Sequence, residues 1–91
     1  MQAKLRQRIR ERDGDMCQRC FAPGAHLHHV CYGGTGRRRI DEEANLITLC
    51  YACHEAAHNR REDRRWCEDW SRHRYGGRID ELIQQKWSVE K

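Results

Sequence analysis

Residues 17–20 read CQRC and residues 50–58 read CYACHEAAH, and these two stretches together decide the fold. Each holds two cysteines separated by two residues, a spacing that lets both thiolates of one turn face a single ion. Two such pairs complete a tetrahedral site with no open position, which is typical of structural zinc. Redox pairing is the alternative, but two pairs in so short a chain favour zinc. We therefore expect a structural zinc ion bound by Cys17, Cys20, Cys50 and Cys53.

The length and composition agree with a fold that needs such a metal. The chain has 91 residues, of which 37% are hydrophobic and 35% are charged. A domain of this size buries too little apolar surface to be comfortably stable by that means alone. We expect a single domain over residues 1–91, in which Cys31 and Cys67 are small buried side chains outside the metal site.

The sequence shows no segment for export or membrane insertion. It has no run of about eighteen apolar residues, and no apolar signal region follows Met1. We expect a cytoplasmic protein with no membrane partner. In that reducing compartment, paired cysteines bind metal more often than they form disulfides.

The charge pattern favours an anionic partner. The formal net charge is +4, and all but three of the eighteen basic residues are arginine. The planar guanidinium group matches phosphate oxygens in a bidentate manner, so nucleic acid is the natural partner. The fourteen acidic residues leave a second interpretation open, in which mixed charge only solvates helix faces.

Hydrophobic spacing and turn residues predict a helix at each end of the chain and a hairpin in the segment that contains the first cysteine pair. Residues 1–12 should form a short basic helix, and residues 78–88 an amphipathic one. Residues 17–31 fit a hairpin better than a helix, because a Pro-Gly pair interrupts any helical period.

The middle of the chain combines a polar loop with a long helical pattern. Residues 32–44 are rich in glycine and charge and predict a loop, which residues 46–49 follow as a short apolar run. Residues 53–75 lack Pro and Gly and predict one long helix. Trp66 and Trp70 lie one turn apart on it, a spacing that favours core packing over stacking on nucleic-acid bases.

Four histidines form the second chemical signal. His54 and His58 are four apart on the predicted helix, so they share a face and can bind one metal ion. His28 and His29 are adjacent, and adjacent strand residues point to opposite faces. One of that pair can therefore bind metal while the other stays available for proton transfer. Two further histidines are expected to be ordinary surface residues: His26 and His73.

The order of these residues resembles the HNH endonuclease family. The motifs are Cys17-x-x-Cys20, His28-His29-Val30, Asn45-Leu46 and Leu49-Cys50-x-x-Cys53-His54. The resemblance covers residues from about 12 to 58 and implies a small ββα-metal core. With the flanking helices, the expected fold class is α+β. The resemblance also implies a metal-dependent endonuclease that hydrolyses DNA phosphodiester bonds, in a family common in phage.

The resemblance assigns a role to each matching residue. It implies that His28 binds the catalytic metal, that His29 is the general base and that His54 is the second metal ligand. Asn45 would bond across the loop to fix the strand that carries the base. His58 is similar to an additional helix histidine of the colicin-type nucleases and is a further candidate ligand.

Two departures from the family pattern bear on the catalytic metal. Many members have aspartate where His28 stands, and a lysine often found after the final Cys-His is replaced by the Glu-Ala-Ala of residues 55–57. Imidazole suits zinc and nickel, whereas carboxylate favours magnesium and manganese. The sequence leaves the catalytic divalent ion open among Mg²⁺, Mn²⁺, Ni²⁺ and Zn²⁺.

Arginines near the proposed site are candidates for nucleic-acid binding and for stabilising charge on phosphate. By position they are Arg37, Arg38 and Arg39, with Arg19 as a further candidate. One site of this kind cuts one strand, so a monomer should nick duplex DNA. A double-strand break needs a dimer or two encounters, and the sequence leaves the oligomeric state open between monomer and weak dimer.

Two other functions share some of these features. His54-Glu55-Ala56-Ala57-His58 also spells the H-E-x-x-H motif of zinc peptidases, with the glutamate as base. We prefer the nuclease because the peptidase also needs a third ligand and a substrate cleft. A non-catalytic, zinc-stapled DNA-binding module is the third possibility, and it has no need of His29.

Overall fold

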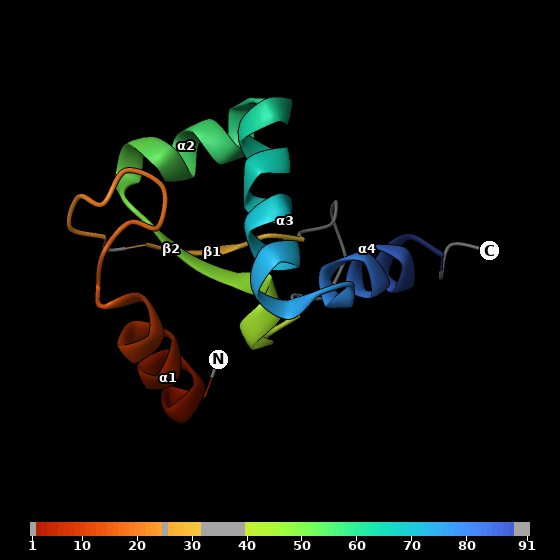
Figure 1. Ribbon diagram of the computed structural model, residues 1–91, viewed down its shortest axis with the longest axis horizontal. Coiled ribbons are helices and arrows are strands. Elements are labelled where there is room, and N and C mark those ends of the chain that lie inside the picture. Colours follow the sequence, from red (N-terminus) through yellow and green to blue (C-terminus); the bar gives the residue numbers. More distant parts are fainter. Residues whose placement is uncertain (1, 25, 32–39, 89–91) are drawn as a thin grey trace.

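The computed structural model describes residues 2–24, 26–31 and 40–88, with side chains up to residue 84. Its helices and strands are, in chain order, α1 (Ala3–Asp13), β1 (His26–His29), the 3-10 turn η1 (Glu43–Asn45), β2 (Leu46–Leu49), α2 (Tyr51–Asn59), α3 (Arg61–Tyr75) and α4 (Arg78–Ser88). The α+β class and the ββα order at the centre are as expected. Figure 1 shows the two strands enclosed by the helices.

The two strands form one antiparallel ladder. His26 pairs with Leu49, His28 with Ile47 and His29 with Leu46. All of β2 is buried, whereas in β1 only His28 is. Burial of both faces explains why β2 reads as a continuous apolar run, and the alternation in β1 explains why one histidine of the pair turns inward.

The hairpin expected within residues 17–31 is wrong in its pairing. That segment forms a tight turn closed by Cys17 N–H donating to the Ala22 carbonyl at 2.7 Å, with an isolated bridge between Met16 and Pro23. The strand that follows pairs with β2 instead. A Cβ at Gly24 would lie 2.7 Å from Thr48 Cγ2, so the turn packs directly on β2 and only glycine fits there.

The single helix expected over residues 53–75 is two helices. Arg60 adopts an extended conformation (φ −125°, ψ 132°) between α2 and α3. The two helices then run in different directions (Figure 1). No Pro or Gly marks this break, but Glu62 and Asp63 occupy the first turn of α3, where acidic side chains favour a helix N-terminus.

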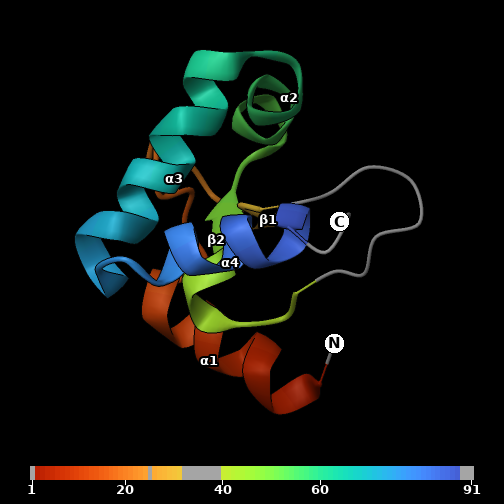
Figure 2. The ribbon, with the colours of Figure 1, turned by 90° about the vertical axis from the view of Figure 1, so that its right-hand side faces the viewer.

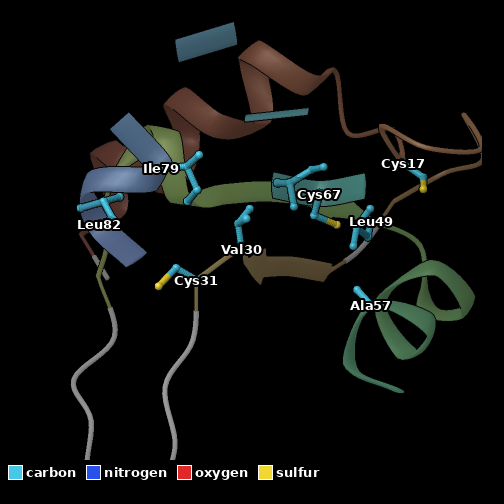
Figure 3. Packing of buried hydrophobic residues seen from close by; sticks show 9 residues of the cluster. Cys17, Val30, Cys31, Leu49, Ala57, Cys67, Ile79 and Leu82 are labelled. Atoms are coloured by element: carbon cyan, nitrogen blue, oxygen red, sulfur yellow. The ribbon is translucent and has the colours of Figure 1, made fainter. Parts of the chain in front are cut away.

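The core lies between the strands and the C-terminal helices. Figure 3 shows Val30 and Leu49 from the strand region facing Cys67 of α3 and Ile79 of α4. Cys31 and Cys67 are buried, as expected. Trp66 and Trp70 are half-buried and pack against this core. The last helix, α4, packs against α3 and η1 (Figure 2).

An arginine at the end of α1 ties that helix to the sheet. Arg12 donates to the carbonyls of Glu43 (2.9 Å) and Leu46 (2.6 Å) and makes a bidentate ion pair with Asp13. Asp13 in turn accepts the backbone N–H of Thr48 at 3.1 Å. These charge-assisted bonds hold the N-terminal helix against β2. None of the described helices is long and apolar enough to cross a membrane.

Candidate active site and metal centres

The two cysteine pairs meet at one point. The four sulfur atoms of Cys17, Cys20, Cys50 and Cys53 lie within 4.8 Å of one another. The Sγ atoms of Cys20 and Cys50 are 3.6 Å apart, close to the roughly 3.8 Å separation of two thiolates on a tetrahedral zinc ion. This cluster can hold a metal ion, and its donor set is that of structural zinc.

Backbone groups already stabilise a thiolate in this cluster. Burial raises the pKa of the Cys17 thiol, but hydrogen bonds from the backbone of Cys20, Cys50 and Arg19 outweigh it and lower the pKa to about 6. The turn of residues 17–20 thus presents a sulfur that is ready to bind a cation at neutral pH.

Three histidines form a second cluster between β1 and α2. Ring nitrogens of His28, His54 and His58 lie within 4.8 Å of one another. The Nε2 atoms of His54 and His58 are 3.1 Å apart, near the separation of about 3.4 Å between two imidazoles on a tetrahedral ion. The geometry therefore fits a divalent cation with imidazole ligands.

Local structure explains how these residues converge. His28 occupies the buried position of β1, and its ring centroid lies 5.1 Å from that of His54 and 5.0 Å from that of His58. Because α2 begins directly after β2, its inner face carries the histidine pair over the strand. Burial lowers the pKa of His28 to about 3, aided by the charges of His54 and His58. Its ring is neutral at pH 7, the form that binds metal.

His29 lies outside this cluster and contacts a carboxylate. Its Nε2 is 2.8 Å from Asp41 Oδ1, and its side chain is 14% exposed. Coulombic repulsion from His29 is among the causes that lower the pKa of His28, although the two rings do not share a cluster. The sequence pattern did not single out Asp41, because it begins an acidic triplet that resembles ordinary loop charge.

Asn45 is fully buried and bridges the two ends of the long loop. Its side chain accepts the backbone N–H of Cys31 at 2.6 Å and donates to the carbonyls of Cys31 (3.2 Å) and Ile40 (2.9 Å). Its own carbonyl accepts the N–H of Val30 at 2.9 Å. Asn45 thus fixes the end of the strand that carries His28 and His29.

The expectation that His26 is an ordinary surface residue is wrong. His26 is half-buried, and its ring centroid is 5.1 Å from that of His54 and 5.8 Å from that of Tyr51. The period-2 alternation of β1 places it on the same side as His28, a signal available in the sequence. His73 is exposed, as expected.

Of the arginines expected to bind nucleic acid, the structure describes one. Arg37, Arg38 and Arg39 lie outside the described residues. Arg19 forms an ion pair with Asp63 and lies 5.1 Å over the ring of Trp66. Its guanidinium group therefore joins the cysteine turn to α3.

The peptidase motif has more support in the structure than the sequence suggested. His28 lies close enough to His54 and His58 to be the third candidate ligand that such a motif needs. Glu55, the base that a peptidase would need, is exposed and accepts a hydrogen bond from the Tyr51 hydroxyl at 3.0 Å.

Comparison with known families classifies the part of the chain that holds both clusters. Residues 17–60 match the model of the family described as HNH endonuclease. This segment, just under half of the chain, is therefore similar to the HNH endonuclease family. The match begins at Cys17, the first residue of the four-cysteine cluster, and ends directly after α2. It therefore contains the four-cysteine cluster, the three-histidine cluster and Asn45. The comparisons with curated proteins and with solved structures gave no significant match.

Proposed function

We propose that this HNH domain is a metal-dependent endonuclease that hydrolyses a phosphodiester bond of DNA, one strand at each site. The observation that carries the proposal is the three-histidine cluster beside His29, within a segment that matches the HNH family. The four-cysteine cluster supports this site through the chain, because Cys50 and Cys53 lie at the start of α2, which also carries His54 and His58.

The residues that would hold the catalytic ion are His28, His54 and His58. A divalent cation bound there supplies positive charge that stabilises the phosphate and the leaving oxygen in the transition state. Three imidazole donors favour zinc or nickel among the possible ions, whereas magnesium and manganese prefer oxygen ligands.

His29 is the proposed general base. Its neutral ring accepts a proton from a water molecule, whose oxygen then forms a bond to phosphorus in line with the leaving group. The bond between phosphorus and the 3′ oxygen breaks, and that oxygen takes a proton from solvent. The products are a 5′-phosphate and a 3′-hydroxyl, which is what the family resemblance implies.

The remaining residues position the strand and the substrate. The hydrogen bonds of Asn45 to the backbone on both sides of the loop support a role in holding His29 in place. Arg37, Arg38 and Arg39 are proposed to contact phosphate, because they lie in the loop between His29 and Asn45.

The test is conversion of supercoiled plasmid to the nicked circle by zinc-loaded protein with added Mg²⁺, Mn²⁺, Ni²⁺ or Zn²⁺. We expect nicking with at least one ion and none from His29→Ala. His73→Ala is the matched control, since His73 is exposed and outside the HNH segment, and it should nick normally. Retarded plasmid without nicking under every ion would instead indicate a non-catalytic DNA-binding module.

A further inference from the structure

We propose that Asp41 is a positioning residue that fixes the tautomer and orientation of His29. This inference rests on the proposed nuclease function, because it assigns a partner to the proposed general base. The base of a hydrolytic site must present an unprotonated ring nitrogen to water, and a neutral imidazole has one such nitrogen.

The contact between the two side chains selects which nitrogen that is. Asp41 Oδ1 lies 2.8 Å from His29 Nε2. An ionised carboxylate can only accept hydrogen bonds, so Nε2 must carry the proton. The lone pair of the neutral ring is then on Nδ1, which is the atom that takes the proton from water. The same logic governs the carboxylate of a serine-protease triad.

The backbone on both sides of this pair is tied down. The Asn45 side chain bonds Ile40, which precedes Asp41, and Cys31, which lies two residues after His29. Glu42, which follows Asp41, makes a bidentate ion pair with Arg78 of α4 at 2.8 and 2.9 Å. Both partners of the 2.8 Å contact are therefore set by the fold rather than by chance loop conformation.

Asp41 does not belong to the metal cluster. Among the described residues, the donor atoms that group around one point in this region come from His28, His54 and His58. An effect of Asp41 on activity should therefore act through His29 and leave the affinity for the ion nearly unchanged.

The experiment compares three variants by nicking kinetics, by metal titration and by the ¹⁵N NMR spectrum of the histidine ring nitrogens. Asp41→Asn keeps the size of the side chain but removes its charge, and its amide can face the ring with either its oxygen or its nitrogen. Asp41→Glu restores a carboxylate. Asp69→Asn is the matched control, because it makes the same substitution at an exposed carboxylate of α3 that pairs with Arg72 and lies outside the HNH segment.

We expect Asp41→Asn to lower kcat about 100-fold with KM changed less than about threefold, as for loss of an orienting group. Asp41→Glu should recover part of kcat, and Asp69→Asn should retain the wild-type kcat. The His29 signals, assigned by their absence from His29→Ala, should show the proton on Nε2 in the wild type and a mixture of tautomers in Asp41→Asn.

Either of two results from Asp41→Asn would overturn the inference, and the wild-type spectrum provides a third test. One is full kcat for Asp41→Asn, and the other is loss of activity that follows weakened metal binding while the tautomer of His29 is unchanged. The NMR result does not depend on cleavage. If the wild type nicks DNA but carries the His29 proton on Nδ1, the role of Asp41 alone is refuted. If the wild type fails to nick with every ion tested, the proposed function alone is refuted.

Discussion

His28 and His29 are neighbours in the chain, yet they enter different chemical environments. The pleat of β1 turns His28 into the cluster with His54 and His58, where burial keeps its ring neutral. It turns His29 to the carboxylate of Asp41. The strand thus separates the proposed metal ligand from the proposed general base although the two residues are adjacent, and the role of each can be tested by one substitution.

The first prediction separates these roles. His29→Ala should abolish nicking and leave affinity for the catalytic ion nearly unchanged, because a general base acts on the transition state and not on the ion. His28→Ala and His54→Ala should weaken metal binding, so that raised metal concentration partly restores their activity. Metal titration beside plasmid nicking measures both quantities.

The peptidase interpretation forecasts the opposite pattern. There Glu55 is the indispensable base, whereas the nuclease interpretation treats it as an exposed partner of the Tyr51 hydroxyl. Glu55→Gln should therefore nick plasmid at close to the wild-type rate. An active His29→Ala beside an inactive Glu55→Gln would contradict the nuclease mechanism.

The second prediction concerns the stability supplied by Asn45. Asn45→Ala removes three side-chain hydrogen bonds and leaves buried backbone groups of Cys31 without these partners. The free energy of unfolding should fall by about 2–4 kcal/mol, as measured by urea denaturation. Asn59→Ala, at an exposed position at the end of α2, should change it by less than about 0.5 kcal/mol. Equal effects of the two substitutions would show that Asn45 does not fasten the loop.

At the scale of elements, the sequence predicts those whose signals are local. The helices Ala3–Asp13 and Arg78–Ser88 lie close to the expected ranges 1–12 and 78–88, because spacing and turn residues mark their ends. The pairing of β1 and the break at Arg60 depend on tertiary contacts. The turn of residues 17–24 packs on β2, and α3 packs on both α2 and α4, and no local sequence pattern specifies these contacts.

The third prediction is that the four-cysteine cluster is required for the element arrangement. Cys50→Ser should lose the bound zinc and the cooperative melting transition, because a structural zinc site contributes folding free energy directly. Zinc content and circular dichroism on heating measure this. Cys67→Ala is the control, since Cys67 is buried but outside the cluster, and it should keep the zinc content of the wild type. A native transition with full zinc content in Cys50→Ser would show that the metal assignment is wrong.

At the scale of the whole molecule, the candidate site shows where sequence reasoning ends. Spacing brings His54 and His58 to one helix face, but their meeting with His28 requires the register of β1 on β2 and the placement of α2. Only the resemblance to a known family predicted that these three histidines lie together. Asp41 had no such signal, because its partner His29 is twelve residues away across the loop.

Whole-molecule charge gives the last prediction, which concerns the grip on DNA. Each arginine that neutralises a phosphate contributes about 0.9 to the slope of log affinity against log salt, through release of counterions. Replacing Arg37, Arg38 and Arg39 together by alanine should therefore flatten this slope by about 2–3. Binding is measured in a His29→Ala background, so that the DNA stays intact. Arg72→Ala is the control, because Arg72 is already paired with Asp80 at 2.7 Å, and its slope should match that of the background protein. An unchanged slope in the triple variant would place the phosphate contacts on other residues.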